Sequence, residues 1–205
     1  MEPPERRRGT PKDPERAQRM ILDAALRRFA ADGYRTVRVS DIARDAGYSE
    51  ATVFHHFGTK ADLFRAVVSG IDSQSTWFSP DAGPEALPRQ MYEGELAYYR
   101  DGRLRGLDRV WSEALAGEPD LLAMMRPALQ GTLEGMETLL AGFATPDRAD
   151  QAHLAARLLM AVSYGARVMR RYDHASLTDE ECAELLRFAA QAAVDTMTGE
   201  GRPLR

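Results

Sequence analysis

The chain has 205 residues, of which 44% are apolar and 28% charged, a composition typical of a folded protein with one large domain or two smaller ones. The net charge of −4 excludes a protein coated uniformly in positive charge, and the single cysteine, Cys182, excludes an intrachain disulfide and fits a reducing compartment. The sequence shows neither a signal peptide nor a stretch of about 20 apolar residues, so we expect a cytoplasmic protein without a membrane partner.

Positive charge gathers at the N-terminal end, where residues 1–60 carry 12 Lys and Arg against 9 Asp and Glu. Residues 1–12 contain three Pro and the basic run Arg6–Arg8, which predicts a flexible basic arm. Asp13 and Pro14 are typical of the N-cap and first position of a helix, and Asp32-Gly33 predicts where that helix ends.

Two short amphipathic helices, at residues 38–45 and 49–57, are predicted next, joined by a tight turn. Gly47 can take the positive φ that ends the first of them, and Ser49 is a good N-cap for the second. Thr59 is expected to begin a further helix that ends near residues 73–75.

This pair of helices has the pattern of a helix-turn-helix. Ile42 and Val53 are predicted to point inward, and the outward positions of the second helix are Glu50, Ala51, Thr52, His55 and His56. The second helix of such a motif normally lies in the major groove of DNA, although helical hairpins with glycine turns also occur in proteins without a DNA partner.

The remainder of the chain is helical in period. Residues 75–88 hold three Pro, a Gly and polar residues, and predict a loop or link. Five further helices are expected at residues 87–99, 104–116, 118–142, 147–172 and 177–198. Because no alternating strand pattern is present, the predicted fold class is all α.

The last two helices have wide apolar and alanine-rich faces. Either two copies of the chain bury these faces in a four-helix bundle, or the faces are buried within one chain, and periodicity does not separate the two. The residues predicted for a dimer interface are Leu158, Val162, Gly165, Met169, Leu185, Phe188, Ala189 and Ala192.

The C-terminal helices are also rich in methionine and aromatic residues. Methionine adapts to irregular cavities, and Tyr or Trp adds a polar group to an apolar pocket, although each such residue is also an ordinary core residue. The residues predicted for a ligand pocket are Met91, Tyr92, Trp111, Met124, Met125, Met136 and Met160.

The run from about Ile21 to Phe64 resembles the TetR family of bacterial transcriptional regulators. The segment VSDIARDAGYSEATVFHHFGTKADLF follows the family pattern, except that Phe54 stands where a Tyr is usual and Val37 where a Thr is common. The resemblance implies a nine-helix homodimer with an N-terminal helix-turn-helix domain, at residues 13–58, and a ligand-binding and dimerisation domain, at residues 59–205. It also supports reading the methionine group as a pocket.

The resemblance and the chemistry of the side chains together imply a set of DNA contacts. Base edges are expected to be contacted by Thr52, Glu50 and Ala51. Phosphates are expected to be bound by Lys60 and His56. The full set predicted to contact DNA is Arg38, Ser40, Glu50, Ala51, Thr52, Phe54, His55, His56, Thr59 and Lys60. The arm at Arg6–Arg8 either enters a minor groove or is a solvated tail.

No metal site, cofactor site or catalytic grouping is predicted, because His55 and His56 are adjacent, His153 and His174 stand alone, and no nucleophile motif is present. The leading interpretation is a repressor that a small molecule releases from an inverted-repeat DNA operator. A ligand-independent DNA-binding protein is the alternative, followed by a helical binding module or enzyme with a degenerate helix-turn-helix.

Overall fold

The computed structural model describes residues 13–74, 79, 81–117, 119–172 and 177–201. Within these ranges it contains nine α-helices, two short 3-10 turns and no strand, which confirms the predicted all-α fold. The predicted basic arm with Arg6–Arg8 lies outside the described residues, as does His174.

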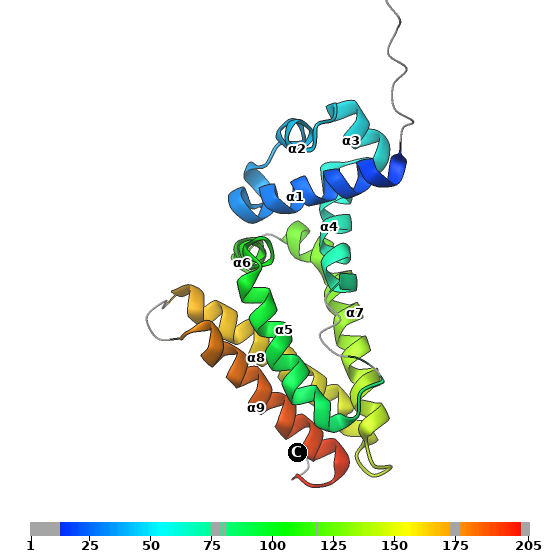
Figure 1. The fold of residues 1–205 in the computed structure, drawn as a ribbon, viewed down its shortest axis with the longest axis vertical. Helices are drawn as coiled ribbons and strands as arrows, with labels where there is room; N and C mark the ends of the chain where they lie inside the picture. Colours follow the sequence, from blue (N-terminus) through cyan, green and yellow to red (C-terminus); the bar gives the residue numbers. More distant parts are fainter. Residues whose placement is uncertain (1–12, 75–78, 80, 118, 173–176, 202–205) are drawn as a thin grey trace, which may run out of the picture.

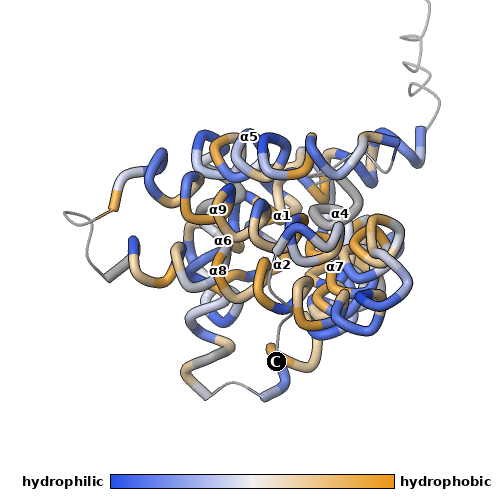
Figure 2. Tube along the Cα trace, turned by 90° about the horizontal axis from the view of Figure 1, so that it is seen from below, coloured by the Kyte–Doolittle hydropathy of each residue, from blue (hydrophilic) through white to orange (hydrophobic). Residues whose placement is uncertain are grey.

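The helices form two groups along the long axis of the molecule (Figure 1). The upper group consists of α1 (Pro14–Thr36), α2 (Val39–Ala46) and α3 (Glu50–Phe57), and α4 (Lys60–Gln74) leads from it into the lower group. The lower group consists of α5 (Leu87–Arg100), α6 (Gly102–Leu115), α7 (Pro119–Phe143), α8 (Ala152–Tyr172) and α9 (Asp179–Thr198). Seen from below, α9 lies between α5 and α8 and packs on both (Figure 2).

The start of α1 is capped as its sequence predicts, because the Asp13 side chain accepts a 3.0 Å hydrogen bond from the N–H of Arg16. The end predicted at Asp32-Gly33 is a break rather than a stop. Gly33 has φ 78° and ψ 166°, outside the helical region, and one more turn follows it to Thr36. The positive φ suits glycine, which lacks a Cβ.

The predicted helix boundaries in the lower group are correct to within two residues, except for the start of α8. Residues 84–86 form a 3-10 turn inside the predicted loop. The helix predicted from residue 147 begins at Ala152, because residues 145–151 are joined by hydrogen bonds to the third residue along, the pattern of a 3-10 turn. The last helix begins at Asp179, where Thr178 and Glu181 form a reciprocal capping box.

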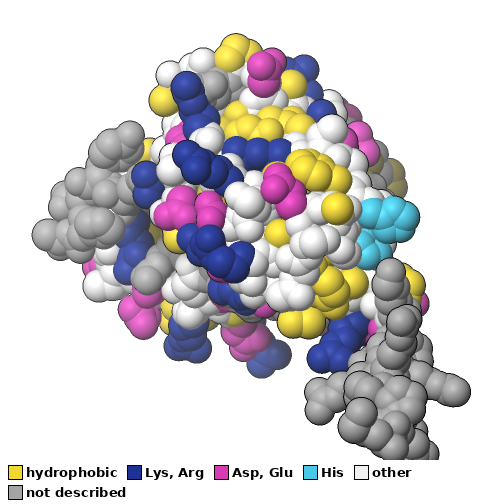
Figure 3. Space-filling model, turned by 90° about the horizontal axis from the view of Figure 1, so that it is seen from above, with side chains coloured by type: hydrophobic (Ala, Val, Ile, Leu, Met, Phe, Trp, Pro, Cys, Tyr) yellow, Lys and Arg dark blue, Asp and Glu magenta, His cyan; other side chains and the backbone are white. Residues whose placement is uncertain are grey.

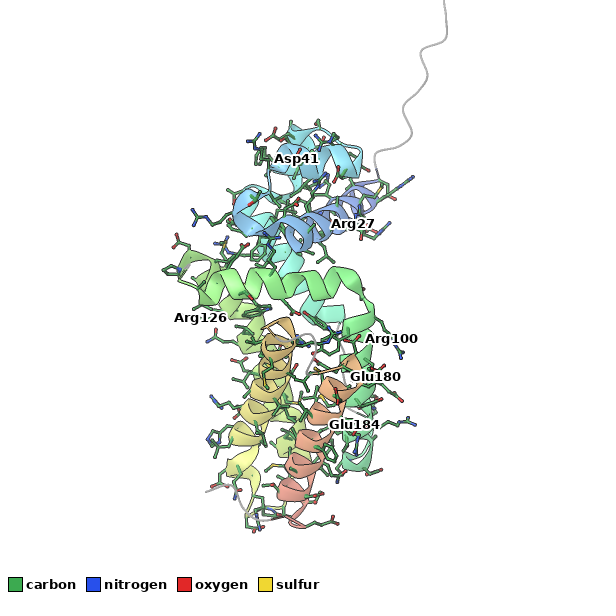
Figure 4. All side chains as sticks on the ribbon, turned by 90° about the vertical axis from the view of Figure 1, so that its left-hand side faces the viewer. Arg27, Asp41, Arg100, Arg126, Glu180 and Glu184 are labelled. Atoms are coloured by element: carbon green, nitrogen blue, oxygen red, sulfur yellow. The ribbon has the colours of Figure 1, made fainter. Side chains whose placement is uncertain are left out.

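Two apolar clusters divide the core. The first joins α1–α4 to the facing sides of α6 and α7, and the second lies between α5, α7, α8 and α9. Helix α6 lies across the molecule where the two groups of helices meet, end-on in Figure 1 and lengthwise in Figure 4. Gly106 of α6 sits directly against Ala30 of α1, since a Cβ on Gly106 would come within 2.4 Å of the Ala30 Cβ. This close approach fixes α6 against α1.

Candidate functional site

The turn between α2 and α3 is fixed by capping bonds at both helix ends. Gly47 closes α2 in the left-handed region, at φ 77°, and its N–H donates to the carbonyl of Arg44 over 3.1 Å. Ser49 caps α3, because its hydroxyl accepts a 3.1 Å hydrogen bond from the N–H of Thr52. Both predicted roles are confirmed, so the crossing of α2 and α3 follows from residues within the motif.

The inward and outward faces of the motif are those predicted. Ile42 and Val53 are buried in the first cluster, and the Arg28 guanidinium of α1 makes two hydrogen bonds to the Asp45 carboxylate of α2, of 2.5 and 3.0 Å. On α3 the exposed residues are Glu50, Ala51, Phe54 and His55, and the half-buried ones are Thr52, His56 and Phe57. At the helix-turn-helix end of the molecule, basic and acidic side chains are interspersed, and histidine side chains lie together at one edge (Figure 3).

The N-terminal end of α2 is open to an incoming group. Its cap residue, Arg38, makes no side-chain hydrogen bond to the helix end, and Arg38 and Ser40 are both exposed. The first amides of a helix attract anions such as phosphate. The position therefore suits a phosphate, and the contacts of Arg38 and Ser40 with DNA stay predictions.

Helix α4 begins with a reciprocal cap between Thr59 and Asp62. The Thr59 hydroxyl donates to the Asp62 carboxylate over 2.6 Å and accepts from the Asp62 N–H over 3.1 Å. The same carboxylate accepts from the Thr59 N–H over 3.2 Å. The hydrogen bond from Thr59 is the main reason that the pKa of Asp62 lies below its usual value. Thr59, predicted to contact DNA, thus also organises the start of α4.

The Lys60 ammonium turns towards α1 instead of the first amides of α4. Its Nζ donates to the carbonyl oxygen of Arg35 over 3.3 Å and lies 4.7 Å from the centroid of the Tyr34 ring. Burial lowers the pKa of Lys60, and the Glu113 carboxylate of α6 acts in the opposite direction. In this structure the cation therefore binds the C-terminal end of α1, where helix carbonyls attract positive charge. Its contact with phosphate stays a prediction.

The same end of α1 is held by two side chains of α6 that the sequence reasoning missed. The Glu113 carboxylate accepts a 3.1 Å hydrogen bond from the N–H of Tyr34, next to the break at Gly33. The Arg109 guanidinium donates to the carbonyl of Ala31 over 3.0 Å. These bonds satisfy backbone groups released by the break, and they tie the lower helices to the helix-turn-helix.

A second missed feature is a buried ion pair between α5 and α8. The Arg167 guanidinium makes two hydrogen bonds to the Glu95 carboxylate, of 3.1 and 3.0 Å, and the Ser163 hydroxyl donates to the same carboxylate over 3.2 Å. Glu95 is 0% exposed and Arg167 is 8% exposed. Burial lowers the pKa of Arg167, but Glu95 together with Tyr98 and Asp108 raises it by more, so the guanidinium keeps its charge.

Aromatic rings surround this pair. The Arg167 guanidinium carbon lies 3.6 Å from the centroid of the Tyr98 ring and 5.6 Å from that of Tyr164. Tyr164 in turn packs edge-on against Trp111, with centroids 5.1 Å apart, and the Tyr98 hydroxyl donates to Asp108 of α6 over 2.6 Å.

One signal of the buried pair was present in the sequence. Glu95 follows Met91 by four residues and precedes Tyr98 by three, so a carboxylate interrupts the apolar stripe of α5. A charge in such a stripe predicts burial with a partner. The identity of the partner had no signal, since Arg167 lies 72 positions along the chain.

The residues predicted for a ligand pocket fall into separate parts of the core. Met124 and Met125 lie in the first cluster, with Trp111 packed against it, and Met91 and Met136 lie in the second. Tyr92 and Met160 are half-buried. The structure does not bring this set together around one centre, and the pocket stays a prediction.

The outer faces of α8 and α9 carry exposed apolar side chains. Phe188 is 61% exposed and Met169 is 58% exposed, and Leu185 and Ala192 also face outward. Leu158, Val162 and Gly165 are half-buried. Ala189 is buried within its own chain and packs in the second cluster. Seven of the eight predicted interface residues are therefore at least partly accessible to a partner.

Two kinds of feature are absent from the described part of the chain. None of its helices has the length and apolar character needed to cross a bilayer. Nor do its His, Cys, Asp and Glu side chains gather in threes in a way that would hold a metal ion.

Comparison with known proteins places the match at the helix-turn-helix. The family of bacterial regulatory proteins named tetR matches residues 21–67. The HTH-type transcriptional regulator SrpR of Pseudomonas putida is 34% identical over 79 residues, which are 38% of this chain and 37% of SrpR. The chain thus spans little more than a third of the length of that relative.

Solved structures show the fold over most of the chain. A putative TetR-family regulator from Rhodococcus sp. superposes with a TM-score of 0.72 at 18% identity, covering 88% of this chain and 99% of that one. A putative transcriptional regulator from Saccharomonospora viridis, solved in complex with choline, gives a TM-score of 0.63 at 20% identity, over 86% and 96% of the two chains.

Proposed function

We propose that this chain, which belongs to the tetR family of bacterial regulatory proteins, is a DNA-binding transcriptional regulator. The observation that carries the proposal is the capped α2–turn–α3 geometry, which buries Ile42 and Val53 and leaves the outer face of α3 free. A helix presented in this way fits the major groove of DNA.

Base reading and positioning fall to different residues in this proposal. Thr52, Glu50 and Ala51, at the start of α3, face the base edges, where a Thr hydroxyl or methyl and a Glu carboxylate have defined partners. Arg38, Ser40 and the histidine pair contact phosphates. Lys60 joins them when its ammonium leaves the carbonyl of Arg35 for a phosphate oxygen.

The regulator acts as a homodimer on an inverted repeat. The exposed Phe188, Met169 and Leu185 on α9 and α8 support a bundle of four helices built from two copies. Such a dimer places two α3 helices about one turn of DNA apart, roughly 34 Å.

A small molecule releases the repressor by binding better to the conformation whose two α3 helices no longer match the operator. The choline complex of the Saccharomonospora viridis protein supports a small-molecule effector in this fold. The bonds from Glu113 and Arg109 to the end of α1 support α6 as the element that transmits the change.

Selection of bound sequences from a random DNA pool tests the proposal with the full chain. We expect enrichment of an inverted repeat by the parent protein. A Thr52→Ala variant should lose the preference at one base pair in each half-site. An unenriched pool, or an asymmetric single site of full affinity, would contradict the proposal.

A further inference from the structure

The Glu95 carboxylate binds the Arg167 guanidinium in a part of the helical bundle where the apolar core is interrupted. The two large clusters lie on either side of it, and the residues between them form only a small cluster with Tyr98, Tyr99, Ala166 and Cys182. Arg167 fills the space beside Glu95, with two hydrogen bonds to the carboxylate, of 3.1 and 3.0 Å.

The pair is not explained by a gain in folding stability. Removing two charges from water carries a penalty that their attraction offsets only in part, and apolar residues of similar volume serve as well or better. The buried pair of a carboxylate and a cation therefore suggests a functional role, because its contribution to folding stability does not account for it.

The surroundings of the guanidinium are those by which proteins recognise organic cations. The ring centroids of Tyr98 and Tyr164 lie 3.6 and 5.6 Å from the guanidinium carbon, Trp111 packs on Tyr164, and Glu95 supplies the opposite charge. Aromatic faces attract a cation through the ring quadrupole, most strongly away from water. Asp108, which accepts from the Tyr98 hydroxyl, adds negative charge.

The packing of the helices leaves a route from solvent to the Glu95 carboxylate. Helix α5 packs on α9 and α9 on α8, whereas the Glu95–Arg167 pair bridges α5 and α8 directly. The Arg167 side chain is 9% exposed and that of Glu95 is not exposed at all, so part of Arg167 reaches solvent. Displacement of one side chain would thus open the carboxylate without unpacking a helix.

We propose that Glu95, Tyr98 and Tyr164 form a binding site for an organic cation of the amidine, guanidine or ammonium class. The Arg167 guanidinium occupies this site in the free protein, and the ligand replaces it. One cation is exchanged for another at the carboxylate, so the buried charge stays balanced. An anionic ligand would meet Glu95 and Asp108, and a neutral one would leave Glu95 without a cation.

The site reaches the helix-turn-helix through one helix. Tyr98 binds Asp108 of α6, and the next turn of α6 carries Glu113, which binds the N–H of Tyr34 in α1. A cation that shifts Tyr98 or Arg167 would therefore bias the position of α6. This effector role rests on the proposed function, whereas the binding of the cation does not.

Calorimetric titration of the full chain without DNA tests the site with three ligands of one shape: benzamidine, benzamide and benzoate. We expect benzamidine to bind at least tenfold more tightly than the other two. Methylguanidinium, which matches the end of the Arg167 side chain, serves as a smaller cationic probe.

Variants of the pair give the decisive comparison. Arg167→Ala removes the resident cation, so benzamidine and methylguanidinium should bind at least tenfold more tightly and raise its melting temperature. Arg167→Met also removes the cation but keeps more of the side-chain volume. It takes the place of Arg167→Ala in the experiment where the alanine variant does not fold. Glu95→Gln should lose the preference for benzamidine over benzamide. Arg157→Ala, an exposed arginine of α8, should leave every affinity unchanged.

Three outcomes would overturn the proposal: no binding of either cation to the parent and the Arg167 variants, a preference for benzoate, or equal benzamidine affinity in Glu95→Gln. Because the titration contains no DNA, its result is independent of the proposed function. A protein that binds benzamidine but selects no DNA sequence would keep the cation site and remove its regulatory role.

Discussion

The two ends of the molecule enclose different kinds of core. In α1–α4 every described side chain that is buried is apolar, whereas the lower helices bury Glu95, Arg167 and Thr196 as well. The helix-turn-helix end is held by bonds between near neighbours in sequence, such as Ser49 with Thr52. The lower end depends on a pair 72 positions apart. The first kind of core presents a fixed surface, and the second keeps a polar centre, where we propose that a cation binds.

The largest effect should come from leaving the buried carboxylate without its cation. Arg167→Ala is expected to lower the free energy of unfolding by about 3–5 kcal/mol, because Glu95 then stays buried and unpaired. Urea unfolding of the full chain measures this change. Arg157→Ala, at an exposed position of the same helix, should change it by less than about 0.5 kcal/mol.

The matched double variant sharpens the same comparison. Glu95→Leu with Arg167→Met replaces both charges by apolar groups, and we expect its stability to be close to that of the parent or higher. A double variant as unstable as Arg167→Ala would show that the pair contributes net stability, and the contrast between the two cores would then disappear.

A second substitution tests whether the exposed apolar face of α8 and α9 forms a dimer interface, as distinct from the core of the single chain. Phe188→Glu places a charge at a side chain that is 61% exposed in one chain, so the monomer should fold normally. In the proposed dimer the charge would be buried, and the dissociation constant should rise by at least about 100-fold, or about 2.7 kcal/mol. Analytical ultracentrifugation measures it.

Thr138→Glu adds the same charge at an exposed position of α7 and is the control. If the parent is a monomer at micromolar concentration, the dimer is excluded. Ala189 is unsuited to this test, because it is buried within its own chain and a charge there would disturb the fold.

The sequence was sufficient for the helix-turn-helix because its geometry is decided locally. Gly47 supplies the positive φ, Ser49 caps α3, and Ile42 with Val53 marks the inward face, all within twelve residues. The number and order of helices also followed from periodicity, and their ends were correct to within a few residues except for the start of α8.

The lower half was predictable only as helices. Which of its residues meet is decided by how α5, α6 and α8 cross, and no local pattern reports a crossing. The sequence analysis missed Glu95, although its place in the apolar stripe of α5 was a signal of burial, and no pattern in the sequence indicated that Arg167 would bind it. In the same way, Lys60 was placed on the basis of its helix end alone, whereas its ammonium binds the carbonyl of Arg35, 25 positions earlier.

Measurements of DNA affinity distinguish two kinds of residue in the helix-turn-helix end: those that read bases and those that position the protein on the DNA backbone. Thr52→Ala should reduce affinity for the selected operator by about 1–3 kcal/mol and hardly at all for random DNA. Lys60→Ala should weaken binding to every sequence alike and flatten the salt dependence by about one unit of slope. Binding isotherms on both duplexes at several salt concentrations distinguish the two. Equal losses on both duplexes for Thr52→Ala would move Thr52 to the backbone contacts.

The smallest effect concerns the start of α4, where a residue predicted to contact DNA also caps a helix. In the folded protein the hydrogen bond from Thr59 holds the pKa of Asp62 below its usual value. The ionised carboxylate therefore contributes stability above its unfolded pKa, and this contribution is lost as the pH falls through the lower, folded pKa.

Thr59→Ala should return the pKa of Asp62 towards its usual value, as followed by NMR titration of the carboxyl group without DNA. The stability difference between parent and variant should be full above about pH 4 and shrink below it, because a protonated Asp62 no longer accepts from the hydroxyl. Thr138→Ala, which removes a hydroxyl bound to the carbonyl of Glu134 within α7, should leave that pKa unchanged. An unchanged Asp62 pKa in Thr59→Ala would show that the Thr59 hydroxyl does not lower this pKa in the folded protein. A shifted pKa with full operator affinity would make it a cap that fixes α4 and does not contact phosphate.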